Sequence, residues 1–326
     1  MTPMPRRRRL LKSAALIGAL PLLRLARAQT PLRIALPSPG TAGSVWRPML
    51  ERLRVADLPA LQWTVSDPGK MQVQLIAGSL DVGFFGPIGL AALRARGNDI
   101  LLFGPGTHNH SVWLVKADSP YQRPADLIGH KIATQPETAE TYQQARTAAS
   151  LAGLDLKRDF QVLHGSPLAN VALFERGDVD AVIVLEPTAT RLVAQGARQI
   201  GRVGDMWRQA SGDASDPFLV GLAAQRSWLD ANRQTATRLA RAFAQANAAI
   251  TRQPDVLREI HAEIGIKAQE KAALDLVAGR MRDTYSSRWD PDVWRGMDRQ
   301  IAAAVSVGIL DQQARTSPVY DGVALS

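Results

Sequence analysis

The chain of 326 residues contains no cysteine. This absence excludes thiol catalysis, cysteine-ligated metals and disulfides, so the fold depends on its hydrophobic core alone. Histidines number only five, and aromatic residues make up 6% of the sequence. His108 and His110 have the i, i+2 spacing that puts two side chains on one face of an extended segment, where they could share a metal. No third histidine or carboxylate stands nearby in the sequence, so we predict neither a metal nor another cofactor.

Long apolar runs are scarce, and the one that stands out lies near the N-terminus. Residues 6–9 are all arginine, 14–23 form an apolar run, and Ala26-Arg27-Ala28 has the small-x-small pattern of a cleavage site. The run is too short to span a bilayer comfortably, which makes a retained anchor the weaker interpretation. We predict a twin-arginine-type signal peptide over 1–28, cleaved after Ala28, and a periplasmic protein.

Without residues 1–28, the rest of the chain has almost no excess of positive charge. The whole chain has a net charge of +9, but residues 1–28 hold seven basic and no acidic residues, and the remaining 32 basic and 30 acidic residues give +2. No basic patch interleaved with aromatics remains, so we expect no nucleic-acid partner. Composition indicates a soluble, exported α/β protein of about 300 residues, long enough for a sizeable core.

A helix–strand unit in the middle of the chain carries strong local signals. Ser166 and Pro167 have the cap and first-turn chemistry of a helix start, and Gly177 stands where a left-handed residue would end the helix. Asp180 then precedes the apolar run 181–185, which is typical of a buried strand.

The same pattern occurs earlier. Asp67 precedes a proline, Gly78 follows eleven positions later and Asp81 three further on, the spacings of the second copy. Two copies, 99 residues apart, predict two lobes of similar build, although two unrelated helix–strand units remain an alternative. Ligands of open parallel sheets bind beyond the carboxyl ends of strands, here residues 85–87 and 185–187.

Other short apolar runs predict further strands, at 32–36, 61–65, 100–103, 112–115, 131–134, 160–163, 199–203 and 218–224. Helices are expected at 45–55, 138–151, 187–195 and over most of 227–326, a tail that must pack on the first lobe. Residues 107–111 look like a polar interruption, and 206–216 like a flexible loop. Ser44 and Thr138 would begin helices in comparable places, so ligands could share their N–H groups.

Three segments, 77–83, 126–133 and 177–187, have the order and spacing of motifs in a known family. With them, the chain resembles the periplasmic solute-binding proteins of ABC importers, in the nitrate/sulfonate/taurine group, which is related in fold to the thiamine-pyrimidine-binding family. The resemblance implies an α/β, two-lobed periplasmic-binding-protein type II fold, in which each lobe is a mostly parallel sheet flanked by helices, with a helical C-terminal extension. It implies lobe I at 29–112 and 221–326, lobe II at 113–220, and hinge closure on a ligand.

Carried across by position, the resemblance implies a pocket between the lobes. It would be lined by Ser38, Thr41, Ser44, Phe85, Gly86, Asn109, His110, Thr138 and Glu186. Leu185 replaces the family's usual tryptophan, and Glu140 lies in a helix turn that would face an anion. The implied function is capture of a small polar or anionic ligand by a monomer, and its delivery to a membrane permease.

Two other functions remain open at this stage. A periplasmic sensor for a receptor kinase would have the same sequence features. A pyrimidine-related binding protein or enzyme is the other alternative. The pyrimidine-synthesising enzymes of this fold have a cysteine-rich iron-site pattern, which this chain, without cysteine, cannot supply. No serine lies in a G-x-S-x-G elbow. Asp81 and Asp180 precede strands at the edge away from the cleft, so we interpret them as turn-forming residues and predict no enzymatic activity.

Overall fold

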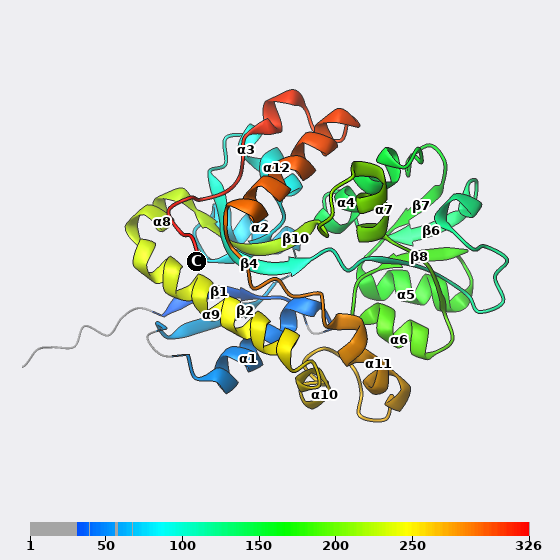
Figure 1. The fold of residues 1–326 in the computed structure, drawn as a ribbon, viewed down its shortest axis with the longest axis horizontal. Coiled ribbons are helices and arrows are strands. Elements are labelled where there is room, and N and C mark those ends of the chain that lie inside the picture. Colours follow the sequence, from blue (N-terminus) through cyan, green and yellow to red (C-terminus); the bar gives the residue numbers. More distant parts are fainter. Residues whose placement is uncertain (1–30, 39, 56–57, 67, 326) are drawn as a thin grey trace, which may run out of the picture. The chain divides into compact units, whose positions relative to one another are not determined.

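The computed structural model describes residues 31–325, apart from 39, 56–57 and 67. Within this part of the chain, the strands form two regions of sheet with helices around them (Figure 1). The predicted signal peptide 1–28, its cleavage after Ala28, and the proposed helix cap Asp67 lie outside the described residues.

The first region of sheet is built mainly from the N-terminal part of the chain. Its pairs are parallel β1–β2 and the antiparallel set β3-β10-β4. A parallel bridge between Ile34 and Val82 joins the two sets, which gives the order β2-β1-β3-β10-β4. Its strands are β1 (Leu32–Leu36), β2 (Leu61–Val65), β3 (Gly83–Phe85), β4 (Ile100–His108) and β10 (Phe218–Gln225).

The second sheet has the order β7-β6-β8-β5-β9, and β5 is antiparallel to both of its neighbours. In each region, therefore, the antiparallel strand is the fourth in the order and the other four share a direction. This matching order confirms that the chain contains two regions of similar build, each mostly parallel. The strands are β5 (Val112–Val115), β6 (Lys131–Thr134), β7 (Gln161–His164), β8 (Ala181–Val184) and β9 (Arg198–Arg202).

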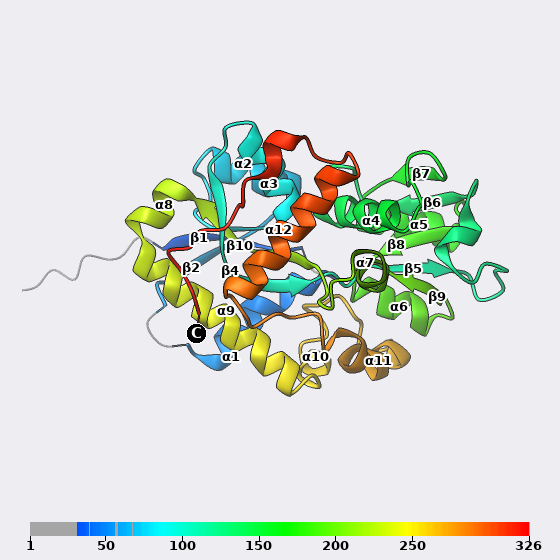
Figure 2. The ribbon, with the colours of Figure 1, turned by 45° about the horizontal axis from the view of Figure 1, so that its top comes forward.

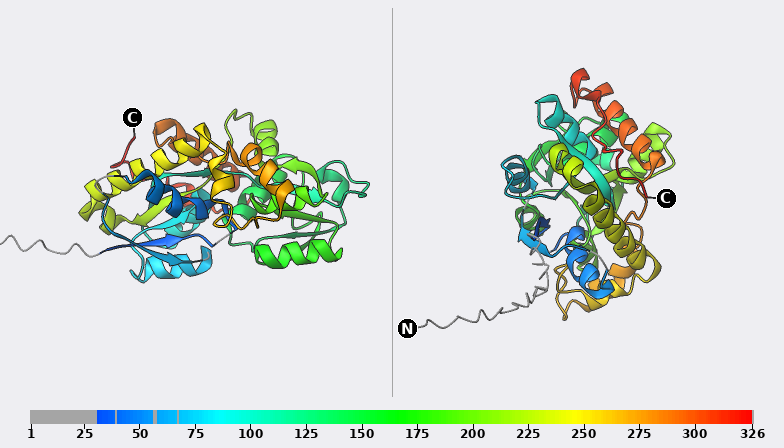
Figure 3. Two further views of the ribbon diagram at one scale, coloured as in Figure 1. Left: turned by 90° about the horizontal axis from the view of Figure 1, so that it is seen from below. Right: turned by 90° about the vertical axis from the view of Figure 1, so that its left-hand side faces the viewer.

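Helices cover both regions of sheet, and α2 and α5 of the repeated units lie on the lower side of their sheets in the left view of Figure 3. The α-helices are α1 (Trp46–Leu53), α2 (Pro68–Ile76), α3 (Pro87–Ala95), α4 (Glu140–Leu151), α5 (Pro167–Arg176), α6 (Thr188–Ala194), α7 (Val203–Ser211), α8 (Arg226–Ala231), α9 (Arg233–Arg252), α10 (Val256–Glu259), α11 (Lys271–Met281) and α12 (Pro291–Ser306). The described residues also form three 3-10 helices: η1 (Ala42–Val45), η2 (Pro124–Leu127) and η3 (Gln312–Arg315).

The local signals of the repeat act as predicted. Ser166 accepts a hydrogen bond from the Ala169 N–H and caps α5. Gly177 and Gly78 have φ angles of 79° and 69°, the left-handed conformation that ends a helix at low steric cost for glycine.

The two aspartates of the repeat are structural, as predicted. Asp81 accepts the Arg33 N–H at the start of β1 at 2.8 Å, and Asp180 accepts the Lys131 N–H at the start of β6 at 3.0 Å. Each carboxylate thus fastens the beginning of one strand to its neighbour.

Four local predictions are wrong in detail. The strand expected at 100–103 continues to His108, because β10 pairs along its whole length and glycines allow a close approach at Gly106. The expected loop 206–216 starts with α7, whose Val203 and Trp207 are buried one turn apart. The helix expected over 45–55 is η1 followed by α1.

The fourth error concerns Thr138, which does not cap α4. That helix begins at Glu140 and its N-cap is Ala139, with φ −77° and ψ 135°. Thr138 is exposed and lies in the turn before the cap. A threonine and an alanine one residue apart differ in capping propensity, but the path of the turn decides which one occupies the capping position.

The C-terminal helical tail packs on the first sheet through α9, which lies against β4. The prediction that the tail packs on the first lobe is incomplete, because α11 contacts α6 and α12 contacts α4, both beside the second sheet. Figure 2 shows α12 extending from the first sheet toward α4. Among the helices of the described part, none is long and apolar enough to cross a membrane.

Candidate functional site

The chain passes between the two sheets twice, at residues 109–111 and 212–217. The Asn109 N–H donates to the Pro217 carbonyl at 2.7 Å, so the two crossings are in contact. The Asn109 side chain is buried and both of its polar atoms are engaged: Nδ2 donates to Gln144 and Oδ1 accepts from the Ser111 N–H. Asn109 therefore fixes the shape of the crossing.

Gln144 of α4 connects the crossings to the rest of the site. Its Oε1 accepts from Asn109 at 2.8 Å, and its Nε2 donates to the Phe218 carbonyl at 2.8 Å and to Glu140 at 2.9 Å. Sequence reasoning missed this residue, because an isolated glutamine within a helix gives no signal of its long-range partners.

Several buried polar atoms near the first crossing have no hydrogen-bond partner among the described residues. They are Thr107 Oγ1, His110 Nε2 and Ser111 Oγ; Thr134 Oγ1, at the end of β6 in the second sheet, also has no partner. Such atoms are costly to bury unless a ligand or water contacts them, so they are candidates for a binding site.

His110 has a defined hydrogen-bonding role. Its Nδ1 lies 2.8 Å from the His108 carbonyl oxygen, an acceptor only, so Nδ1 carries the proton and Nε2 is left as an acceptor. Burial lowers the pKa of His110 to about 4, so the ring is neutral at neutral pH. His108 also contacts a carbonyl, that of Asp283, and within the described residues no group of three or more metal-ligating side chains occurs.

Glu186 lies buried after β8 and is fully engaged. Its carboxylate accepts from the Thr190 N–H at 2.8 Å and the Thr190 hydroxyl at 2.6 Å, and pairs with Arg280 of α11 at 2.7 Å. Tyr285 donates from its hydroxyl to the Ala42 carbonyl, and burial together with the charge of Glu186 raises the pKa of Tyr285. No local pattern in the sequence indicates Arg280 or Tyr285 as a site residue.

The loop after β1 holds three predicted site residues in a self-contained turn. Thr41 Oγ1 donates to the Ser38 carbonyl at 2.8 Å, and Ser44 Oγ donates to the Thr41 carbonyl at 2.7 Å. The hydroxyl protons are therefore used within the turn, and the oxygens remain able to accept.

The loop after β3 is the point where α4 meets α3. Gly86 is the N-cap of α3, and a Cβ built on it would collide with Glu140 and with the Leu219 carbonyl. Phe85 is half-buried beside it. The nine predicted site residues therefore fall into the loop after β1, the end of β3, the first crossing, the turn before α4 and the end of β8.

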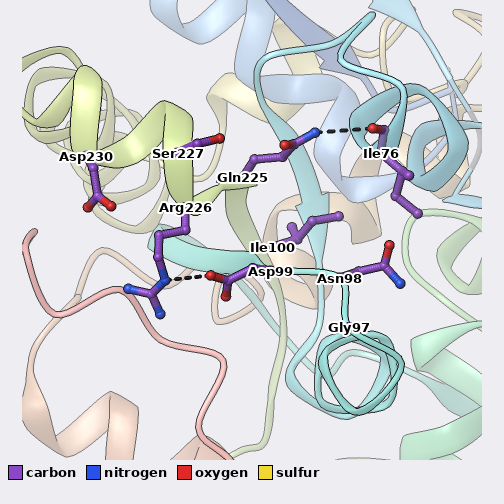
Figure 4. Close-up of a pocket in the computed structure, with 9 residues that line it drawn as sticks. All are labelled: Ile76, Gly97, Asn98, Asp99, Ile100, Gln225, Arg226, Ser227 and Asp230. Carbon is purple, nitrogen blue, oxygen red and sulfur yellow. Dashed lines mark hydrogen bonds and ion pairs between the residues drawn. The ribbon is translucent and has the colours of Figure 1, made fainter.

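A cavity of about 430 Å³ lies elsewhere, beyond the start of β4 (Figure 4). Its polar side chains largely satisfy one another or nearby backbone: Arg226 pairs with Asp99, Gln225 donates to the Leu75 carbonyl, and Asp230 accepts from Tyr320. Because these groups already have partners and none of the predicted site residues lines it, we do not assign the ligand to this cavity.

The fold is that of a substrate-binding protein: it has two matched sheets, the first of which is completed by β10 after the chain returns from the second, and buried polar groups at the crossings. Residues 38–274 match the family described as ABC transporter, phosphonate, periplasmic substrate-binding protein. The chain belongs to this family. It is therefore the substrate-binding component of an ABC transporter, which confirms the predicted small-molecule ligand, delivery to a membrane permease, periplasmic class and non-enzymatic role.

Known relatives agree with this family. The chain is 26% identical over 261 residues to an aliphatic sulfonates-binding protein of Escherichia coli (strain K12), covering 72% of this chain and 81% of that protein. It is 26% identical over 159 residues to the taurine-binding periplasmic protein of the same organism, covering 45% and 48%.

Solved structures show the same fold. The periplasmic aliphatic sulphonate binding protein SsuA from Escherichia coli superimposes with a TM-score of 0.69 at 20% identity, covering 91% of this chain and 94% of that one. The alkanesulfonate-binding protein SsuA from Xanthomonas axonopodis pv. citri, bound to MOPS, gives 0.70 at 19% identity, covering 90% and 97%. These relatives support the importer prediction and give no support to the sensor alternative.

Proposed function

We propose that this protein captures a small sulfonate-type ligand between two lobes, 29–112 with 221–326 and 113–220, and delivers it to its permease. The names of two relatives, one for aliphatic sulfonates and one for taurine, support this ligand class. Strand pairing supports lobes of this kind, with boundaries that differ by a few residues from those predicted. The second sheet already includes β5 from Val112, and the first sheet includes β10 from Phe218.

The observation that carries the proposal is the set of unpartnered polar atoms at the first crossing. The hydroxyls of Thr107 and Ser111 can donate to a sulfonate oxygen, and the acceptor Nε2 of His110 suits an ammonium or hydroxyl on the same ligand. An aminosulfonate such as taurine carries both groups. Closure of the lobes about residues 109–111 and 212–217 would enclose it.

Among the other predicted site residues, Ser38, Thr41 and Ser44 keep free oxygen acceptors, and Phe85 offers an apolar wall. Asn109 and Glu186 act in our proposal by holding the crossing and the loop after β8 in shape, because their polar atoms are already engaged. Thr138 would contact the ligand only at the edge of the site, since it is exposed.

The test is ligand identification followed by binding measurements. Native mass spectrometry of the purified protein should detect a sulfonate that is released from it. Calorimetry should give higher affinities for taurine and alkanesulfonates than for nitrate and methylphosphonate. Thr107→Val and His110→Phe should each weaken binding about tenfold, the loss of one hydrogen bond to a charged ligand.

Thr237→Val provides the matched control, because this hydroxyl lies on α9 and donates to the Arg233 carbonyl. Its affinity should equal that of the parent. Equal affinity of the Thr107→Val and His110→Phe variants would move the ligand away from the crossing, and the absence of binding to every tested anion would contradict the sulfonate assignment.

Export of a monomer by the twin-arginine route, with cleavage after Ala28, completes the proposal. The arginines at 7 and 8 and the apolar run 14–23 support it. Replacing Arg7 and Arg8 by lysine should leave the protein folded in the cytoplasm, as measured by fractionation. Normal export of that variant would exclude the twin-arginine route.

A further inference from the structure

The carboxylate of Glu140 reaches out of the first turn of α4 and binds the N-terminus of α3. Oε2 accepts the Gly89 N–H at 2.7 Å, and Oε1 accepts the Ile88 N–H at 3.2 Å and the Gln144 Nε2 at 2.9 Å. We call these three donors, with the backbone of 86–89, the α3 seat. Glu140 and Gly89, which this contact joins, are 51 residues apart in the chain.

The α3 seat is shaped for an oxyanion. A side chain at Gly86 would collide with Glu140, and a Cβ at Gly89 would lie 3.2 Å from Oε2, so glycine at both positions leaves room for the carboxylate. Pro87 occupies the first turn of the nine-residue α3, where its missing N–H costs nothing, and the helix dipole adds positive potential at this end. In the structure the seat holds the two carboxyl oxygens of Glu140.

The donors of the seat are all neutral. Burial outweighs the hydrogen bonds from Gly89, Gln144 and Ile88 and raises the pKa of Glu140 to about 7. A sulfonate has the same need for N–H donors as a carboxylate, and it stays ionised at lower pH. The two groups would therefore compete for the same two N–H groups, and they cannot occupy them together.

We propose that Glu140 is a specificity-determining residue, a built-in anion that keeps the α3 seat from the oxyanion of a ligand and so lowers the affinity for such ligands. The inference rests on the proposed function, since it concerns selection of the ligand between the lobes. A ligand that places its oxyanion at the first crossing binds without disturbing Glu140. A ligand that needs the seat must first displace it.

The experiment compares Glu140→Ala with the parent, using sulfate and methanesulfonate as probes in a phosphate-free buffer of constant ionic strength at pH 8. Calorimetry and thermal shift are measured for both proteins. Glu140→Ala should bind the two anions at least tenfold more tightly than the parent and should show a rise in Tm that the parent lacks. Glu175→Ala, which removes an exposed carboxylate of α5, should behave as the parent.

Glu140→Asp protects the test against a folding failure of the alanine variant. Aspartate keeps the charge but is one methylene shorter, so it should leave the seat partly open and give an intermediate gain. A folded variant that binds sulfate no better than the parent would overturn the proposal and leave Glu140 as a simple contact between α3 and α4. The parent's own ligand, measured separately by native mass spectrometry, distinguishes that outcome from a failure of the transport proposal.

Discussion

The two repeated units each place a carboxylate at the start of the helix that follows the strand, but they supply it differently. After β8 the carboxylate is local: Glu186 binds the third residue of α6, Thr190, and pairs with the guanidinium of Arg280. After β3, the position that corresponds to Glu186 is Gly86, which has no side chain. The carboxylate that accepts the N–H of Gly89, the third residue of α3, belongs instead to Glu140 of α4. One carboxylate is compensated by a cation and the other by neutral donors only.

The difference teaches that a shared backbone pattern does not fix the electrostatics of the site. The first unit depends on the protonation state of Glu140, whereas the second is held by an ion pair. Four experiments test this contrast, beginning with the largest expected effect.

Arg280→Ala should have the largest effect on stability. Glu186 would remain buried with only Thr190 as its partner, and an uncompensated buried carboxylate costs about 3–4 kcal/mol. Urea denaturation measures the loss. Arg191→Ala is the control: it removes the neighbouring, more exposed pair with Glu270, and should cost less than about 1 kcal/mol. Equal losses in the two variants would remove the distinction.

Glu140→Gln should remove a pH dependence. The pKa of Glu140 is raised from 4.5 to about 7, so the folded state binds the proton more tightly than the unfolded state. The stabilisation is complete below about pH 4.5 and is lost as pH rises through 7, and its full size is about 3 kcal/mol.

Comparison of the two proteins by denaturation at pH 5 and pH 8 isolates Glu140 from other groups. His110 works in the opposite direction: its pKa is lowered to about 4, so its contribution is lost as pH falls from 6.5 toward 4 in both proteins. If parent and Glu140→Gln show the same pH slope, the carboxylate does not titrate in this range.

Gly78→Val and Gly177→Val test whether the two units are equivalent in their backbone. Both glycines have positive φ, which a β-branched residue adopts at a cost of about 1–2 kcal/mol. The two losses should agree. Gly279→Val, at a helical glycine of α11 with open space around it, should change stability by less than about 0.5 kcal/mol. A loss in only one of the pair would show that the units end their helices differently.

Thr138→Ala should have the smallest effect. Ser166 caps α5, so its replacement by alanine should lower the free energy of unfolding by about 1 kcal/mol. Thr138 lies before the cap of α4, so Thr138→Ala should change the free energy of unfolding by less than about 0.5 kcal/mol. Thermal denaturation of both variants suffices. A loss at Thr138 equal to that at Ser166 would indicate that Thr138 contributes to the helix start in solution.

Local chemistry explains why much of the fold was predictable. Glycine stops, the Ser166 cap and the strand-leading aspartates act over a few residues, so their spacing is visible in one sequence. The helix α7 was missed because the residues after Trp207, at 208–213, are mostly polar or glycine, and its burial depends on packing against α4.

The candidate site was harder to predict because its main contacts are long-range. Glu140 meets Gly89 across 51 residues, and Arg280 meets Glu186 across 94. A sequence shows a glutamate in a helix turn, but it does not show which N–H group that glutamate will reach. That a glutamate at position 140 would face the ligand could be predicted from the sequence, but its partners, the Ile88 and Gly89 N–H groups, are known only from the structure.

The late return of β10 to the first sheet has a consequence for the order of folding. Strands β5 to β9 are contiguous, within residues 112–202, so the second sheet can assemble as soon as that segment is available. The first sheet needs β10, which pairs with β3 and β4 from more than a hundred residues further along the chain. Closing so long a loop slows folding, and until it happens the edges of β3 and β4 lie unpaired and open to aggregation. The first sheet therefore contains the strands that are synthesised first, but it is the second of the two sheets to finish folding.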